Sequence, residues 1–203
     1  MSAPFRTRFT VALLLSGLCI GVPSVQAQAP SPPRTDSDTT EKGAPYVPTP
    51  EHVVLRLLTL ADVSSDDVVY DLGSGDGRMV ILAAKEFGAR GVGVEIDSQL
   101  VQEARRRAQR AGVSHLVEFR QGNLFDTNLD DATVVTLYLW PDMNNRLRPK
   151  LQRELDSGDR VVSHSFDIDG WSPDTTVTLE DGTMGGVTKT LFRWTLPDSS
   201  NAP

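Results

Sequence analysis

Short apolar runs alternate with amphipathic segments along most of the chain. Runs rich in valine predict buried strands, and apolar positions spaced three or four residues apart predict helices that cover them. Strands are predicted at 68–72, 91–96, 116–121, 132–139 and 160–166, and helices at 49–61, 78–87, 98–111 and 142–155. Strands that alternate with helices pair in parallel through right-handed crossovers. The pattern therefore predicts a Rossmann-like, doubly wound α/β sheet.

Two further strands, at 175–179 and 187–196, follow each other without a helix between them. Such a pair is typical of an antiparallel hairpin, so we expect seven strands, mostly parallel, with this hairpin at one edge. In the first helix, Thr49 is predicted to be the N-cap, with Pro50 in the first turn. The folded domain is expected to span residues 46–197.

The first 27 residues differ from the rest of the chain. Two arginines and no acid precede an apolar run at 11–22, and Val25-Gln26-Ala27 has the small-x-small pattern of a signal-peptidase site. Residues 1–27 are therefore predicted to be a signal peptide, or an uncleaved anchor that tethers the domain to a membrane. A proline-rich tether at 28–45 and a short tail at 198–203 are expected to be disordered.

Composition and charge exclude several classes of function. The chain of 203 residues has a formal net charge of −7, which disfavours nonspecific binding to nucleic acid. Its single cysteine, Cys19, lies inside the predicted signal, so a disulfide scaffold, a cysteine nucleophile and a cysteine metal site are excluded from the mature domain. No metal site is predicted, and the sequence leaves the oligomeric state open.

The segment "VVYDLGSGDGR" is the strongest functional signal. Gly73, Gly75 and Gly77 follow a strand directly and precede a helix, so a ligand can lie against bare backbone at the helix N-terminus. A dinucleotide fingerprint would place its third glycine at the position of Arg78, and a Walker loop would need a lysine after the glycines. Both alternatives are disfavoured.

The string from Asp71 to Gly77 resembles the first motif of class I S-adenosylmethionine-dependent methyltransferases. The resemblance implies that Glu95, at the end of the next strand, accepts both ribose hydroxyls, and that Asn123 receives the adenine amino group. The implied cofactor site comprises Asp71, Gly73, Ser74, Gly75, Gly77, Glu95, Ile96, Asn123 and Leu124, with Ile96 and Leu124 on either side of the adenine. Asp97 is predicted to cap the following helix.

The strings "YVPTPEHVV" and "GWSP" narrow the resemblance to the lysine methyltransferase family that includes the mitochondrial enzymes acting on the ATP synthase c subunit and the adenine nucleotide translocase. This implies a protein substrate with an exposed lysine. A small-molecule acceptor, and a noncatalytic envelope module that keeps the pocket, stay open as alternatives. Because S-adenosylmethionine is made in the cytosol, a cytoplasmic protein with a different start codon also stays open beside an exported or membrane-anchored one.

The end of the fourth strand is where such enzymes meet their acceptor. It reads Tyr138-Leu139-Trp140-Pro141 and lacks the Asn-Pro-Pro-aromatic motif of enzymes that methylate nucleobase amines, which argues against a nucleic-acid substrate. Tyr138 and Trp140 are candidates to surround an amine by cation–π contact, or else pack under the next helix. His164 is interpreted as a core histidine rather than a base. "ARRRAQR", at 104–110, is predicted to be a solvated helix face with Glu103 near Arg107.

Overall fold

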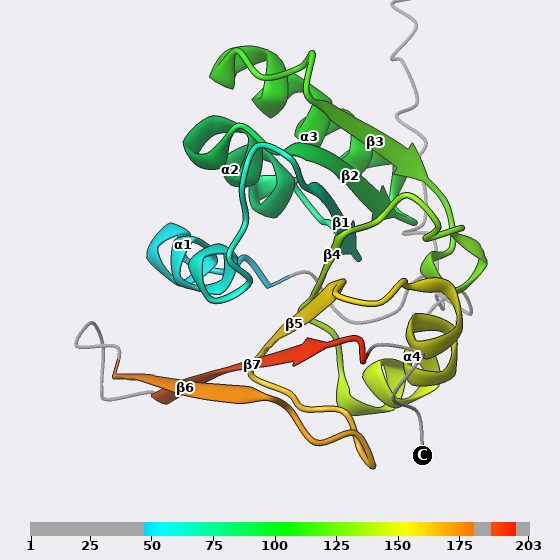
Figure 1. Ribbon diagram of the computed structural model, residues 1–203. Coiled ribbons are helices and arrows are strands. Elements are labelled where there is room, and N and C mark those ends of the chain that lie inside the picture. Colours follow the sequence, from blue (N-terminus) through cyan, green and yellow to red (C-terminus); the bar gives the residue numbers. More distant parts are fainter. Residues whose placement is uncertain (1–46, 181–187, 198–203) are drawn as a thin grey trace, which may run out of the picture. The chain divides into compact units, whose positions relative to one another are not determined.

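The computed structural model describes residues 47–180 and 188–197, which contain a seven-stranded sheet (Figure 1). The strands are β1 (Val68–Leu72), β2 (Arg90–Glu95), β3 (Val117–Gln121), β4 (Val134–Leu137), β5 (Arg160–His164), β6 (Thr175–Glu180) and β7 (Thr188–Thr195). Their order is β3-β2-β1-β4-β5-β7-β6. The first five strands pair in parallel, and β7 is antiparallel to both of its neighbours. The predicted doubly wound sheet with an antiparallel edge pair is confirmed.

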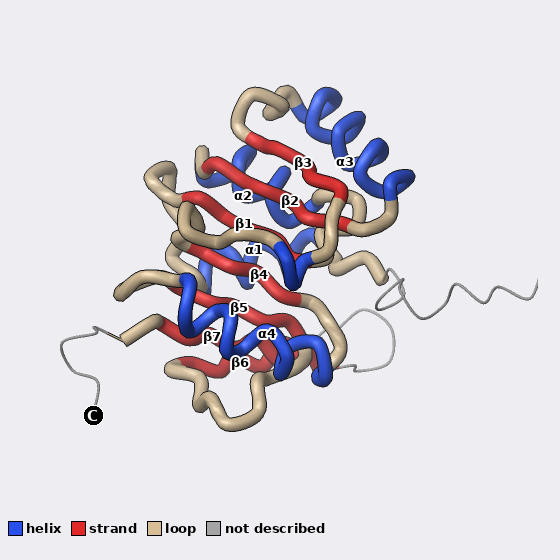
Figure 2. The backbone as a smooth tube through the Cα atoms, turned by 90° about the vertical axis from the view of Figure 1, so that its right-hand side faces the viewer, coloured by secondary structure: helices blue, strands red, loops and turns tan. Residues whose placement is uncertain are grey.

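Helices cover both faces of the sheet, as Figure 2 shows. The helices are α1 (Glu51–Leu60), α2 (Arg78–Phe87), α3 (Ser98–Ala111) and α4 (Pro141–Glu154), with a short 3₁₀ turn at Leu124–Asp126. The first three pack on one face over Val69, Val134 and Val162. On the other face α4 packs over Val135, Leu137 and the buried Trp194. Alternate residues of the central strands thus contribute to two separate cores, which explains why β1, β4 and β5 are rich in apolar residues on both faces.

The strand order reverses beside β1, because β2 lies on one side of it and β4 on the other. In open α/β sheets, ligands bind beyond the carboxyl ends of the strands at such a reversal. The glycine turn after β1, Glu95 at the end of β2 and Tyr138 after β4 all lie at this edge. The topology therefore brings the sequence-predicted site residues to one place.

Three local predictions were wrong. The fifth strand ends at His164, and not at residue 166 as predicted. Pro50, not Thr49, is the N-cap residue of α1, and Thr49 turns its hydroxyl to His164 instead, with 3.3 Å between Oγ1 and Nδ1. The fourth strand ends at Leu137, two residues earlier than predicted, so Tyr138 lies in the loop after it.

The predictions for the segments at 1–27, 28–45 and 198–203 concern residues outside the described part of the chain, as does Tyr46, the first residue of the expected domain. Among the helices that are described, none combines the length and the apolar character needed to cross a membrane.

Candidate active site

The glycine turn after β1 is held against β2. All three glycines have positive φ, 84° at Gly73, 52° at Gly75 and 77° at Gly77, a conformation that other residues rarely adopt. The amides of Gly73 and Ser74 both donate to the carbonyl of Val94 at 2.9 Å. A β-carbon at Gly73 would stand 2.8 Å from Cδ2 of Leu139, so the turn lies directly against the segment that follows β4. The glycine turn is therefore a neighbour of residues 138–141, the segment predicted to meet the acceptor and called the acceptor segment below.

Glu95 turns its carboxylate towards the glycine turn. Its Oε2 accepts a hydrogen bond from the amide of Gly75 at 2.9 Å, and its Oε1 accepts one from the amide of Asp97 at 3.0 Å. The side chain is half-buried. A carboxylate has about four lone-pair sites, so each oxygen keeps capacity for one more donor. The position and remaining acceptor capacity fit a ribose diol.

Asp71 is buried beneath the turn, where its Oδ1 accepts a hydrogen bond of 2.7 Å from the Thr136 hydroxyl. Burial raises the pKa of Asp71 to about 7; the Thr136 hydrogen bond opposes this increase and the charge of Glu95 adds to it. Because the pKa is higher in the folded state, the buried charge begins to destabilise the fold as the pH rises above about 4, and the full cost is reached above pH 7. A cationic ligand above the turn would offset that cost.

Two arginines that sequence reasoning did not assign to the site converge on Asp76 within the turn. Arg78 donates to both carboxylate oxygens at 2.9 and 2.8 Å, and Arg107 of α3 forms a second ion pair with Oδ2. The prediction of Glu103 near Arg107 was wrong, since Glu103 pairs with Arg106 and Arg110. Arg78 lies only two residues from Asp76, but Arg107 is 31 residues away, and the only sequence signal for its contact was the acid within the glycine string.

A chain of contacts leads from the glycine turn to the acceptor segment. Arg78 Nη1 donates to the carbonyl of Thr49 at 2.6 Å, and the Thr49 hydroxyl lies 3.3 Å from the ring of His164. That ring is fully buried and lies 4.1 Å, centroid to centroid, from the ring of Tyr138. Burial, together with the charge of Lys189, lowers the pKa of His164 to about 4, so the imidazole is neutral at pH 7. The residue is a core histidine, as interpreted, yet it supports Tyr138.

The stability of the fold at low pH should depend on the burial of His164. Below pH 6.5 the unfolded chain protonates this histidine while the folded protein resists until about pH 4, so stability is lost as the pH falls through that window. His164→Gln should remove up to about 3 kcal/mol of the acid-induced loss. Urea unfolding of both proteins at pH 7 and pH 4.5 measures the difference. The exposed His115→Gln is the control, and an effect of His164→Gln that does not change with pH would contradict this account.

The remaining predicted residues lie at the same edge with different exposure. The Ser74 hydroxyl is buried without a hydrogen-bond partner among the described residues and faces Gly93, below the turn. Ile96 is exposed and Leu124 is buried. The Asn123 side-chain oxygen caps the 3₁₀ turn by accepting from the amide of Phe125 at 3.0 Å. Trp140 is half exposed and packs its ring 5.8 Å from that of Phe166.

A glycine turn after β1, an acid at the end of β2 and a strand order that reverses beside β1 define the class of Rossmann-like methyltransferases. A family model described as the ANTKMT methyltransferase domain matches residues 71–175. The chain belongs to this family and uses S-adenosylmethionine as its methyl donor.

Individual relatives agree with the family. A protein-lysine N-methyltransferase of Saccharolobus islandicus (strain REY15A) is 50% identical over 141 residues, which are 69% of this chain and 88% of that protein. The adenine nucleotide translocase lysine N-methyltransferase of Mus musculus is 40% identical over 130 residues, 64% of this chain and 56% of the relative. This chain therefore matches little more than half of the length of that animal protein.

A solved structure is also similar. A Salinibacter ruber protein described as an RNA methyltransferase, in complex with S-adenosyl-L-homocysteine, superposes with a TM-score of 0.71 at 56% identity. The match covers 77% of this chain and 97% of the other.

Proposed function

We propose that this protein transfers the methyl group of S-adenosylmethionine to the side-chain amine of a lysine in a protein. Support comes first from the relatives, because the 50% identical protein from Saccharolobus islandicus is named a protein-lysine N-methyltransferase and is matched over most of its length. The animal relatives are named for lysines of the ATP synthase and of the adenine nucleotide translocase.

The chemistry of the acceptor segment is the structural observation that carries the proposal. Three aromatic side chains, Tyr138, Trp140 and Phe166, lie in the segments that follow β4 and β5 at this edge, and the neutral His164 lies behind Tyr138. Aromatic faces attract an alkylammonium, and an uncharged imidazole does not repel it. No amide side chain takes the place of the asparagine that would hold a planar base amine, since the segment reads Tyr-Leu-Trp-Pro.

The proposed roles of the residues follow from their positions. The cofactor supplies a methyl group on a sulfonium, which is a good leaving group, so the protein has to align the reactants and exclude water. Glu95 would hold the ribose, and the glycine turn would admit the amino-acid tail of the cofactor. Ionised Asp71 would lie beneath the positive charge of the cofactor. The lysine, with an ordinary pKa near 10.4, must lose its proton before transfer. Cation–π contact favours the charged amine that enters, whereas removal of water around it lowers the pKa and favours the neutral amine that reacts.

The Salinibacter ruber relative makes RNA the competing acceptor. A polyanion is bound mainly by cations that neutralise its phosphates. Here Arg78 and Arg107, the arginines beside the glycine turn, are both paired with Asp76, and the chain carries a net charge of −7. The electrostatics therefore favour a protein acceptor.

Methyl transfer to defined pools tests the proposal directly. The purified full chain would be incubated with isotope-labelled S-adenosylmethionine and, separately, with unmethylated cellular protein, RNA and small-molecule extracts. We expect label in the protein pool, recovered as methylated lysine after acid hydrolysis. Label in RNA or in small molecules would show that the acceptor is not a protein lysine. Cofactor binding without transfer to any pool would indicate a noncatalytic binding module.

Cofactor affinity should increase with pH through the titration of Asp71. In the free protein its pKa is about 7, and a cationic ligand favours the ionised form, so binding at lower pH releases a proton. The affinity for S-adenosylmethionine should be about tenfold higher at pH 8 than at pH 6. Calorimetry at the two pH values measures this ratio, and Asp71→Asn should abolish the dependence. An equal pH dependence in both proteins would exclude Asp71 as its source.

We further propose that residues 1–27 direct the chain out of the cytoplasm or anchor it to a membrane, and that residues 28–45 act as a tether. The basic-apolar-small pattern of the sequence supports this proposal. The intact mass of protein purified from its native source tests this. A mature start at Gln28 would support export, whereas a chain that begins elsewhere within the tether would indicate a different start codon.

A further inference from the structure

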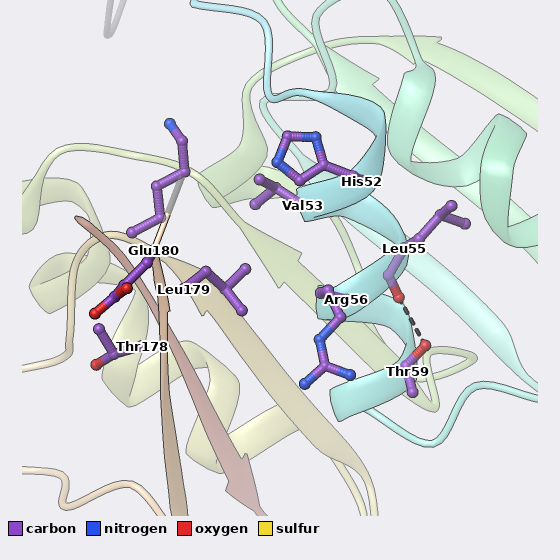
Figure 3. A pocket seen from close by; sticks show the side chains of 9 residues that line it. His52, Val53, Leu55, Arg56, Thr59, Thr178, Leu179 and Glu180 are labelled. Carbon is purple, nitrogen blue, oxygen red and sulfur yellow. Dashed lines mark hydrogen bonds between the residues drawn. The ribbon is translucent and has the colours of Figure 1, made fainter. Parts of the chain in front are cut away.

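An open groove of about 430 Å³ runs between α1 and the β6–β7 hairpin. Figure 3 shows side chains of α1, among them His52, Val53 and Arg56, on one side of it and those of β6, among them Leu179, on the other. We call it the α1 groove and define it by His52, Leu55, Arg56, Leu179, Glu180 and Lys189. None of these residues has a role in the proposed cofactor site.

Strand register places the α1 groove at the acceptor edge of the sheet. Pairing of β5 with β7 ends at His164 and Leu191, after which the amide of Ser165 donates to the carbonyl of Thr190 at 2.7 Å. Strands β6 and β7 continue further, through Lys189 opposite Leu179 and Thr188 opposite Glu180. The hairpin therefore projects beyond the carboxyl end of β5, which is the end where the glycine turn and Tyr138 lie.

The first helix begins at the same edge. Thr49, two residues before α1, contacts His164, whose ring lies against Tyr138. His52 in the first turn of α1 lines the groove. His52, at one end of the α1 groove, is thus only three residues along the chain from Thr49, which contacts the histidine behind Tyr138. A protein whose lysine lies beside Tyr138 can place its neighbouring residues in this groove.

The groove has an apolar base and a cationic rim. Leu55 and Leu179 contribute apolar surface. Among the described residues that line the groove, Arg56 and Lys189 contribute positive charge and Glu180 contributes the one carboxylate. Within the described residues, neither Arg56 nor Lys189 takes part in an ion pair. In a chain with a net charge of −7, this local excess of positive charge is suited to carboxylates. Two cations beside leucines are a poor match for a phosphate backbone.

We propose that the α1 groove binds the segment of the acceptor protein next to the methylated lysine, and that this segment carries apolar and acidic side chains. The inference rests on the proposed lysine methyltransferase function and extends it to substrate selection. The groove then determines which lysines are modified, while the cofactor site is the same for all of them.

Two synthetic peptides with one central lysine test the proposal. One has a flank of leucine, valine and glutamate, and the other has arginine in place of each glutamate. With the full chain, kcat/KM for methylation should be about five- to tenfold higher for the acidic peptide, and the preference should vanish at high salt. The double variant Arg56→Glu, Lys189→Glu should abolish or reverse the preference through KM, while the affinity for S-adenosylmethionine is unchanged.

The control is Arg90→Glu, which reverses the charge of an exposed arginine at the start of β2, at the opposite end of the strands. It should leave the peptide preference intact. An acidic preference that survives in the groove double variant would overturn the proposal. Two other results would also overturn it. If the double variant changes RNA binding but not peptide binding, the occupant of the groove is RNA. If it changes the oligomeric mass measured by sedimentation but not peptide binding, the occupant is a second copy of the chain.

A binding measurement distinguishes a failure of the groove proposal from a failure of the lysine assignment. A fluorescent copy of the acidic peptide with methionine in place of lysine accepts no methyl group but keeps its flank. Anisotropy should show that it binds the unmodified chain about fivefold more tightly than the groove double variant. If this difference in binding is observed but no lysine peptide is methylated, the peptide-binding role of the groove is supported and the lysine assignment is rejected. Equal binding to both proteins would reject the groove.

Discussion

Replacing Gly77 by alanine is expected to destabilise the fold by about 2 to 5 kcal/mol. Gly77 has a φ of +77°, which is strained for any residue with a side chain. In addition, a β-carbon there would stand 2.6 Å from Cζ of Phe119 and 2.8 Å from Cβ of Ala104. Both neighbours are buried, so the added methyl group would have to displace β3 or α3. The midpoint and slope of urea unfolding measure the loss.

Gly112, after α3, offers a matched control. Its φ is +74°, close to that of Gly77, but nothing lies within 4 Å of the place that a β-carbon would take. Gly112→Ala should therefore show the backbone strain alone, about 1 kcal/mol. Equal losses in the two variants would show that close packing under the turn does not matter.

Loss of the Glu95 carboxylate is expected to weaken S-adenosylmethionine binding at least about a hundredfold. Hydrogen bonds to a charged group contribute roughly 1.5–3 kcal/mol each, and a ribose diol would make two of them. Glu95→Ala also removes the acceptor for the amide of Gly75, so the glycine turn loses a support. Isothermal titration calorimetry with the cofactor measures the affinity, and urea unfolding shows whether the fold survives.

Asp97→Ala serves as the comparison for Glu95→Ala. Asp97 lies two residues further on, and its side chain caps α3 by accepting from the amide of Gln99 at 2.8 Å. Its removal should cost about 1 kcal/mol of stability, as is usual for an N-cap, and leave cofactor affinity almost unchanged. If both variants lose affinity to the same degree, the effect of Glu95 comes from the α3 terminus and not from a contact with ribose.

The convergence of the site residues could be predicted from the sequence because it depends on chain direction alone. Strands of a parallel sheet end at one edge, so a glycine turn after the first strand and an acid after the second must lie near each other. Asp97 was predicted correctly as a cap for a similar reason, since capping is decided within three residues.

Contacts between distant side chains could not be predicted in the same way. The helical pattern around Arg107 suggested a partner within α3. Instead, Arg107 pairs with Asp76, because a carboxylate buried in the glycine turn is costly unless a cation lies beside it. Thr49 was expected to cap α1, yet Pro50 takes the cap position and the threonine hydroxyl meets His164, 115 residues further along the chain. In both cases the tertiary partner outweighed a local preference.

The edge position of β6 has a consequence for evolution. Within the described part of the chain only β7 bonds to this strand, so substitutions of its exposed residues disturb no other strand pairing. If the α1 groove selects the acceptor as proposed, a change on this hairpin would alter which lysines are modified without touching the glycine turn or Glu95.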